Sequence, residues 1–309
     1  MGMARKKGTV GVIGLGIMGG AFARNLLAAG WRVIGYDIDP ARRRALARAG
    51  VEMAADTGAL AGAVRTIILS LPNPAALAAT VAAIAHAAAR PLAIIEAGTF
   101  TLADKLEAAR ALDAAGHVML DCPISGTGAQ AKTRDIVVYA SGDAKTIRRL
   151  RPVFAGFARQ AHDLGALGNG SRMKYVANLL VAINNVAAAE AMVLGMKSGL
   201  APQTIYDMVR SGAGNSRIFE LRGPMMVHNR YDDPTMKVAL WQKDMQVIGD
   251  FAAALGCPTP LFRATQPIYD AALAAGHGPH DTASVCAVLE ARAGLKRGKT
   301  GKSRTSPRK

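Results

Sequence analysis

The run Gly14-Leu15-Gly16-Ile17-Met18-Gly19 limits this chain's possible folds more than any other feature. It follows a short apolar segment, 10–13, and opens a segment of helical composition, 17–29. The next strand-like segment, 32–36, is followed by Asp37, which lies 23 residues after Gly14. An order of strand, glycine turn, helix, strand and acid is what binding a dinucleotide requires. The sequence therefore predicts a nucleotide-binding βαβ unit at its start.

Each position in this run has a predicted task. Gly14 permits the tight turn, Gly16 lets the backbone approach a pyrophosphate, and Gly19 lets the helix pack on its strand. The first helical residues, Ile17 and Met18, bring free N–H groups and partial positive charge to the phosphates.

Asp37 indicates which dinucleotide is preferred. A carboxylate at this point accepts hydrogen bonds from the adenosine ribose and repels a 2′-phosphate, so NAD is favoured. Arg42, Arg43 and Arg44 follow shortly after and keep NADP possible. We interpret the three arginines as a solvated helix face.

The first half of the chain alternates in the manner of a parallel sheet covered by helices. The predicted strands are 10–13, 33–36, 66–71, 92–95, 118–120, 136–140 and about 161–164, and the helices between them are 17–29, 41–49, 75–88 and 102–115. Ligands in such sheets bind at the carboxyl ends of the strands. Four loops there, 14–19, 71–74, 98–99 and 123–128, are expected to face one crevice.

After Gly170 the pattern changes. Residues 171–198 are apolar on most sides and contain neither Pro nor any Gly except Gly195, which predicts one long buried helix. Further helices are predicted at 202–210, 216–227, 235–255, 261–275 and 282–293. The fold class is an α/β Rossmann-type doubly wound sheet followed by an all-α domain. The expected domains are 1–165 for dinucleotide binding, 166–295 for substrate and oligomer contacts, and 296–309 as a disordered basic tail.

Net charge, apolar runs and cysteine spacing limit the classes of partner that we expect. The net charge is +16 over 309 residues, but the last 14 residues hold seven Lys or Arg and no acid, which leaves +9 elsewhere. Nucleic-acid binding is therefore not expected beyond weak contact by the tail. No uninterrupted apolar run with charged flanks suggests a membrane span, and we expect a cytoplasmic protein. Cys122, Cys257 and Cys286 are far apart, so we expect free thiols and no metal site.

Lys174 and Asn178 lie four apart near the start of the long helix and therefore share a face. A lysine on an apolar helix is costly to bury unless it has a partner or a function. Near a substrate carbonyl it could donate a proton as hydride arrives, and burial would lower its pKa toward the working range. The alternative is that Lys174 reaches solvent from the helix end.

With these motifs the chain resembles the β-hydroxyacid dehydrogenase family, the relatives of 3-hydroxyisobutyrate dehydrogenase. The resemblance covers nearly everything from Thr9 to Ala293. Four segments carry it: the glycine run already described, Asp121-Cys122-Pro123-Ile124-Ser125-Gly126, Gly168-Asn169-Gly170-Ser171-Arg172-Met173-Lys174 with Asn178, and Lys243-Asp244-Met245.

The resemblance implies roles for the matching residues. Lys174 matches the catalytic lysine, and Asn178 matches the amide that orients it and the substrate. The substrate carboxylate is expected to bind Ser125 with the backbone at Gly126 and Thr127. The residues that match the cofactor-contacting positions are Leu71, Pro72, Asn73, Thr99 and Lys243.

The family also implies a function: NAD-dependent interconversion, with NADP possible, of a small anionic β-hydroxy acid and its semialdehyde or oxo form. Homodimers or homotetramers are implied as well. Thr127 replaces a usual glycine, and Glu96-Ala97-Gly98-Thr99 replaces a more common aspartate and serine-threonine arrangement, so the substrate's identity stays open. Two alternatives are an imine reductase-like enzyme, against which Lys174 counts, and a catalytically silent, dehydrogenase-like binding module that uses its basic tail.

Overall fold

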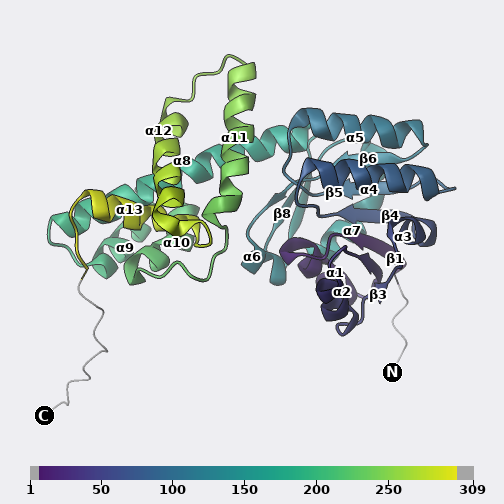
Figure 1. Ribbon diagram of the computed structural model, residues 1–309, viewed down its shortest axis with the longest axis horizontal. Helices are drawn as coiled ribbons and strands as arrows, with labels where there is room; N and C mark the ends of the chain where they lie inside the picture. Colours follow the sequence, from purple (N-terminus) through teal and green to yellow (C-terminus); the bar gives the residue numbers. More distant parts are fainter. Residues whose placement is uncertain (1–6, 298–309) are drawn as a thin grey trace, which may run out of the picture. The chain divides into compact units, whose positions relative to one another are not determined.

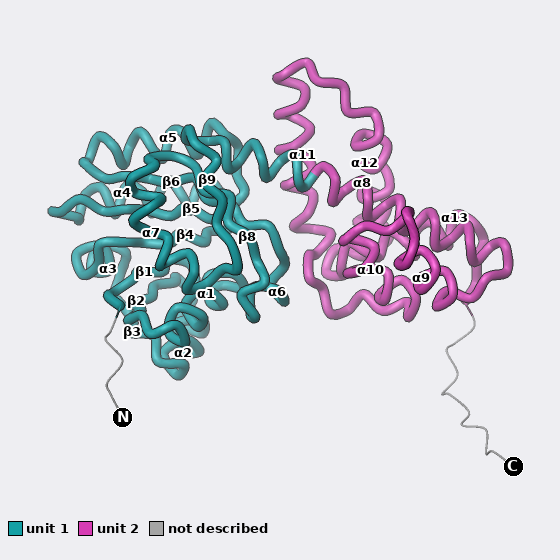
Figure 2. Tube along the Cα trace, turned by 180° about the vertical axis from the view of Figure 1, so that it is seen from behind, with its two compact units in different colours: residues 1–178 teal, residues 179–309 magenta. Residues whose placement is uncertain are grey.

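The computed structural model describes residues 7–297, which form two compact units. The first unit extends to Asn178 and the second begins at Leu179 (Figure 2). This division falls later than the predicted boundary after residue 165. The first turns of the long helix belong to the sheet unit because their side chains bond to the sheet's strand ends, as described below.

Unit 1 is built on a six-stranded parallel sheet with the order β3-β2-β1-β4-β5-β6 (Figure 1). The order reverses direction at β1 and β4, which is the point where open α/β sheets bind ligands. The strands are β1 (Thr9–Ile13), β2 (Arg32–Tyr36), β3 (Glu52–Met53), β4 (Thr66–Leu69), β5 (Ala93–Glu96) and β6 (Val118–Asp121).

Both faces of this sheet are covered, as a parallel sheet requires. Side chains such as Val12 and Ile68 face one core, which α1 (Ile17–Ala28) and α7 (Ala144–Phe157) cover. Neighbouring residues such as Ile67 and Leu69 face a second core under α3 (Thr57–Ala63), α4 (Pro74–Ala87) and α5 (Leu102–Ala114). The predicted doubly wound architecture is confirmed.

One part of the predicted sheet is wrong. The segments expected to complete it instead form a separate three-stranded sheet of β7 (Ile124–Ser125), β8 (Val137–Ala140) and β9 (Gln160–Asp163). The chain leaves the large sheet at Cys122 and Pro123, and Pro123 has no N–H to continue a ladder. A single antiparallel bridge between Asp121 and Ser141 links the two sheets.

Three helices of this unit were not predicted, besides the short strand β3. They are α3, α6 (Gly128–Lys132) and α7. Asp143 caps α7 by accepting a hydrogen bond from the Thr146 N–H at 2.7 Å. The helix α2 (Pro40–Ala47) lies close to its predicted position.

Unit 2 is entirely helical in the residues described. It continues α8 (Asn169–Lys197), which begins in unit 1, and adds the following elements: α9 (Pro202–Ser211), α10 (Arg217–His228), α11 (Val238–Ala254), α12 (Pro260–Ala272), a π turn η1 (Leu273–His277), a 3-10 turn η2 (Thr282–Ser284) and α13 (Val285–Arg292). The predicted all-α second half is confirmed. The basic tail lies outside the described residues from 298 on, whereas Arg297 is described and donates to the Val227 carbonyl at 2.8 Å.

The helix α8 is long and apolar enough to cross a membrane by length and composition alone. The core helix of a soluble protein meets the same criteria, so this is weak evidence. Contrary to the prediction of a buried helix, less than half of its most apolar stretch is buried within one chain. Val176, Leu180 and Leu194 are more than half exposed.

Candidate functional site

The glycine run forms a tight turn from β1 into α1. Gly14 has φ +86° and donates its N–H to the Tyr36 carbonyl at 2.9 Å. A Cβ at Gly14 would lie 2.2 Å from the Ser70 carbonyl oxygen, and one at Gly19 would lie 1.8 Å from the Gly14 carbonyl oxygen. Backbone contacts this close exclude any side chain, so the chain's own packing requires both glycines.

Gly16 differs from these two because nothing in the protein crowds it. A Cβ there would meet only the flexible end of Arg42, at an ordinary 3.5 Å. Ile17, the first residue of α1, is 70% exposed. A glycine that packing does not demand, at the N-terminus of a 12-residue helix, leaves room for a ligand at the helix's positive end. These residues fit the pyrophosphate of a dinucleotide.

Asp37 is buried next to this loop. Its Oδ2 accepts the Leu15 N–H at 2.7 Å, and its Oδ1 accepts the Asp39 N–H at 2.8 Å. The Arg42 guanidinium lies 3.5 Å from Asp37 Oδ2 and 3.4 Å from Asp39 Oδ2. Arg42 is half-exposed, yet it is directed at the acid, which the solvated-face interpretation did not anticipate. Arg43 instead packs over the Tyr36 ring.

The other cofactor candidates follow neighbouring strands. Leu71 and Pro72 follow β4, and the Leu71 side chain lies next to Gly14. Asn73 caps α4, because its Oδ1 accepts the Ala76 N–H at 2.8 Å. Thr99 follows β5 in a partly buried loop. All four therefore lie at the edge of the sheet that carries the glycine run.

The predicted substrate loop begins in β7 with Ser125, which is half-buried. Gly126 has φ +133° and packs against Ile136. Thr127 caps α6: its N–H donates to Gln130 Oε1 at 3.0 Å, and its hydroxyl interacts with Gln130 as well. The threonine that replaces a usual glycine is thus explained by a capping box. This cap engages the Thr127 N–H that was expected to bind substrate.

Lys174 reaches this loop from the first turns of α8. Its Nζ donates to the Ile124 carbonyl oxygen at 2.7 Å, which places the ammonium beside Ser125. The contact rules out the alternative in which Lys174 extends into solvent. Asn178 follows one turn later and is buried.

The glycine run and the substrate loop also meet each other. A Cβ at Gly128 would lie 2.4 Å from Ile17 Cγ2, and the Asn25 side chain on α1 donates to the Ala131 carbonyl on α6 at 2.7 Å. Ile17, Ser125 and Lys174 are therefore brought to one region of unit 1. Met18 is partly buried against the adjacent core.

Lys243 lies on α11 in unit 2. Its Nζ is 3.2 Å from Oδ1 of the buried Asp244, and its own side chain is 41% exposed. Its role toward the cofactor stays a prediction. Trp241, two residues earlier and on another face of the helix, is core: it is buried against Tyr269.

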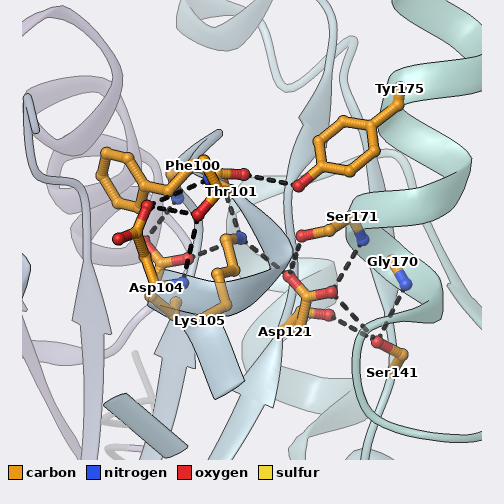
Figure 3. A network of polar contacts seen from close by, with 11 residues as sticks. Phe100, Thr101, Asp104, Lys105, Asp121, Ser141, Gly170, Ser171 and Tyr175 are labelled. Atoms are coloured by element: carbon orange, nitrogen blue, oxygen red, sulfur yellow. Dashed lines mark hydrogen bonds and ion pairs between the residues drawn. The ribbon is translucent and has the colours of Figure 1, made fainter. Parts of the chain in front are cut away.

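Sequence reasoning missed a buried ionic cluster at the start of α8, which includes Lys105 and Asp121 (Figure 3). Lys105 Nζ lies 2.6 Å from Glu96 Oε2 and 2.7 Å from Asp121 Oδ1, and donates to the Gly98 carbonyl at 2.7 Å. All three charged side chains are buried. Burial opposes the charge on Lys105, but the two carboxylates outweigh it, so the pKa of Lys105 is raised.

A signal for this cluster was present in the sequence. Lys105 shares the apolar face of α5 with Ala108, Ala109 and Leu112, which are all buried. Glu96 and Asp121 each end an apolar strand. A lysine on the core face of a helix needs an acid nearby, so Lys105 itself was the signal that a buried acid had to be present.

The comparisons with known proteins agree with this geometry. Residues 9–168 match the family described as the NAD binding domain of 6-phosphogluconate dehydrogenase. Residues 168–289 match that described as the NAD-binding domain of NADP-dependent 3-hydroxyisobutyrate dehydrogenase. The chain belongs to the β-hydroxyacid dehydrogenase family. The predicted resemblance is confirmed, and with it NAD(P) as the class of cofactor.

Individual family members align over almost their full length. An L-threonate dehydrogenase of Cupriavidus necator is 32% identical, covering 91% of this chain and 95% of its own. A solved 3-hydroxyisobutyrate dehydrogenase of Salmonella typhimurium has a TM-score of 0.82 and 33% identity, covering 91% and 99% of the two chains. A solved Mycobacterium tuberculosis 3-hydroxyisobutyrate dehydrogenase with L-serine has a TM-score of 0.83 and 30% identity over 91% and 98%.

The imine reductases are more distant relatives. The Streptomyces aurantiacus imine reductase reaches a TM-score of 0.61 at 20% identity, a likeness that concerns the fold alone. Hydroxy-acid dehydrogenases in the family align with higher identity and closer geometry. The dehydrogenase interpretation is therefore favoured over the imine reductase-like one and over a silent binding module.

Proposed function

We propose that this family member interconverts a small β-hydroxy acid and its semialdehyde or oxo form by hydride transfer, with Lys174 as general acid and base. One observation carries the proposal: Lys174 Nζ lies 2.7 Å from the Ile124 carbonyl, directly before Ser125. A proton-transferring amine thereby meets a carboxylate-binding loop, while the glycine run that fits a dinucleotide packs against the same loop through Ile17 and Gly128.

NAD(P) supplies the hydride acceptor or donor when bound. Gly14, Gly16 and Gly19, with the N–H groups of Ile17 and Met18, would hold its pyrophosphate, and Asp37 would hold the adenosine ribose. Loops at Leu71–Asn73 and Thr99 would line the same ligand, and Lys243 keeps its predicted role in cofactor binding. Because Asp37 is an acid, NAD is the proposed first choice, and Arg42 offers a partner for a 2′-phosphate.

The substrate would be a small hydroxy-acid anion. The hydroxyl of Ser125 and the N–H of Gly126 would bind its carboxylate. Thr127 would contribute less than expected, since Gln130 engages its N–H. In oxidation, Lys174 Nζ takes the hydroxyl proton as the carbon loses hydride, and in reduction it returns that proton to the oxygen. The Asn178 amide would hold the lysine and the reacting oxygen in register.

Removing the lysine amine tests this role. We expect Lys174→Ala to lower kcat by about 10²- to 10⁴-fold, since a positioned acid or base contributes that much. The dissociation constant for NAD⁺, measured by fluorescence titration, should stay within about twofold because the nucleotide contacts lie elsewhere. Lys132→Ala, an exposed lysine on neighbouring α6, is the control. Parallel loss of turnover and NAD⁺ binding would instead identify Lys174 as structural.

A spectrophotometric screen that follows reduction of the nicotinamide can identify the substrate. L-Threonate, both enantiomers of 3-hydroxyisobutyrate, and L-serine are tested with NAD⁺ and NADP⁺. The expected result is turnover of at least one, with NAD⁺ preferred. Asp37→Ala should weaken NAD⁺ and narrow its advantage over NADP⁺ because the ribose contact and the repulsion of a 2′-phosphate are both removed. An unchanged ratio would contradict the ribose contact.

We also propose a cytoplasmic homodimer or homotetramer. The support is the apolar face that α8 leaves exposed in one chain, which includes Val176, Leu180 and Leu194. Apolar surface of this kind gains stability when a second copy covers it. Light scattering coupled to size-exclusion chromatography gives the number of chains, and a monomer at all concentrations would contradict the proposal.

A further inference from the structure

We propose that Lys105 is a positioning residue for Lys174: with Glu96 it fixes Asp121, and Asp121 sets the start of α8 from which the Lys174 amine reaches the substrate loop. The inference rests on the proposed role of Lys174. It concerns three buried charged side chains to which the proposed function assigns no role.

Asp121 binds the first turn of α8 directly. Its Oδ2 accepts the Ser171 N–H at 2.7 Å, and its Oδ1 accepts the Ser171 hydroxyl at 2.9 Å. The cluster of two carboxylates and one ammonium carries a net charge of −1, which lies at the positive end of a 29-residue helix. Charge and hydrogen bonds thus both hold the helix terminus at β6.

The start of α8 is pressed against the strand ends as closely as backbone allows. A Cβ at Gly170 would lie 2.4 Å from the Tyr139 carbonyl oxygen and 2.6 Å from that of Asp121. Ser141 accepts the Gly170 N–H at 2.9 Å through its hydroxyl, and the Tyr175 hydroxyl donates to the Phe100 carbonyl at 2.5 Å (Figure 3). The first two turns therefore have one position and one rotation.

The same short segment binds the helix twice. Asp121 holds Ser171, and Ile124, three residues later, accepts the Lys174 ammonium. Lys174 lies about one turn after Ser171, so a shift of the helix start moves its amine relative to Ser125. Misplacement by about 1 Å can cost about 10²-fold in rate. Among residues 7–297, the cation that lies on Asp121 is Lys105, and Glu96 in turn anchors Lys105.

Three variants that share the substitution Glu96→Gln test the inference. Glu96→Gln keeps the Lys105–Asp121 bond, so kcat should fall by no more than about threefold. Glu96→Gln combined with Lys105→Met removes the ion pair while nearly preserving shape, and kcat should fall by about 10- to 100-fold with KM changed little. The variant that combines Glu96→Gln with Lys105→Arg keeps a cation at position 105, and its kcat should lie above that of the Lys105→Met combination. Val81→Ala, a buried change on α4, controls for lost stability alone.

A labelling experiment separates this inference from the proposed function. Folded protein is treated briefly with acetic anhydride, and acetylation of Lys174 is measured by peptide mass spectrometry against the exposed Lys145. The Lys174 to Lys145 ratio should rise several-fold in the double variant and stay constant in Val81→Ala. If Lys174→Ala retains turnover, the proposed function fails whatever this ratio shows.

An unchanged labelling ratio, with kcat in the double variant equal to that of Val81→Ala, would overturn the positioning role and leave the proposed function standing. Should the double variant fail to accumulate as folded protein, Ser171→Ala takes its place. That variant deletes one hydroxyl bond to Asp121 and should lower kcat several-fold at constant KM, whereas an unaltered kcat would equally overturn the inference.

Discussion

Within the part of the chain that the structure describes, each unit buries one cation against acid, Lys105 in unit 1 and Arg222 in unit 2, and the two differ in how completely they are hydrogen-bonded. In unit 1, Lys105 donates hydrogen bonds to the Gly98 carbonyl and to Asp121 Oδ1, both at 2.7 Å, and forms an ion pair with Glu96 Oε2 at 2.6 Å. In unit 2, Arg222 lies 3.3 Å from Asp281 Oδ1, and its Nη1 is buried without a hydrogen-bond partner among the described residues. The acceptors around the Lys105 ammonium are as many as its N–H donors, whereas the Arg222 guanidinium has more N–H donors than nearby acceptors.

The acids show the opposite balance. Asp281 accepts the backbone N–H groups of Thr235, Met236 and Ala283, so its charge is well hydrogen-bonded without Arg222. In unit 1, the described residues provide the Glu96 carboxylate with the Gly98 N–H as its one partner besides Lys105. The cation is therefore indispensable in unit 1 and auxiliary in unit 2, a difference that residue type and burial alone do not show.

The largest expected effect tests this difference. Lys105→Met leaves a buried carboxylate poorly compensated and should destabilise unit 1 by about 3–5 kcal/mol. Arg222→Met should cost unit 2 about 2 kcal/mol, because Asp281 keeps its backbone donors. Urea unfolding followed by fluorescence can separate the two units, since Trp31 lies in unit 1 and Trp241 in unit 2.

The matched backgrounds are Trp31→Phe and Trp241→Phe, each of which leaves one reporter. Equal losses from Lys105→Met and Arg222→Met would break the comparison. A larger loss from Arg222→Met would show that its unpaired Nη1 has a partner in solution, such as a buried water.

Buried tyrosines give the next effect. Burial raises the pKa of Tyr175 in unit 1 and of Tyr269 in unit 2 to about 12 each. The unfolded tyrosine ionises near pH 10, so the folded state binds the extra proton between about pH 10 and 12 and stability falls across that window. Tyr175→Phe and Tyr269→Phe should each remove about 2 kcal/mol of this pH-dependent loss.

Buried thiols act at lower pH in both units. Burial raises the pKa of Cys286 in unit 2 to about 12, and it raises the pKa of Cys122 in unit 1 as well. Because an unfolded thiol ionises near pH 8.5, both units should begin to lose stability above that pH. Cys286→Ala should remove the early part of the loss from unit 2 alone, and an unchanged pH profile of Trp241 unfolding would contradict this.

The nucleotide loop could be predicted residue by residue because its constraints are local. Gly14 and Gly19 must be glycines because a side chain at either position would collide with backbone a few residues away or just after the adjoining strand. The Lys174 match could be predicted as well, although its contact with Ile124 spans fifty residues and needed the structure. The motif's own residues determine the geometry of the local turn. The partners of a side chain depend instead on which strand ends the fold brings together.

The second sheet shows what the sequence could not supply. Segments 137–140 and 160–163 are strands as expected, but strand patterns do not name a partner. The partner is decided by Pro123 and by the bridge from Asp121 to Ser141. Lys105 was overlooked for a related reason: its two acids are remote in sequence, and only the sheet brings them together.

The smallest effect concerns one non-glycine residue with positive φ in each unit. Arg134 has φ 63° in the turn after α6, and Asn229 has φ 50° as the C-terminal cap of α10. An arginine pays the full cost of the left-handed region, about 1 kcal/mol, while an asparagine is tolerated there. Arg134→Gly should therefore stabilise unit 1 by up to about 0.5 kcal/mol, because the entropy that glycine adds to the unfolded chain offsets at least half of the relieved strain. Asn229→Gly should change the free energy of unfolding of unit 2 by no more than a few tenths of a kcal/mol.

Urea midpoints in the two single-tryptophan backgrounds measure both changes. A loss of stability in Arg134→Gly would mean that the exposed arginine side chain makes a contact that stabilises unit 1 by more than the strain costs.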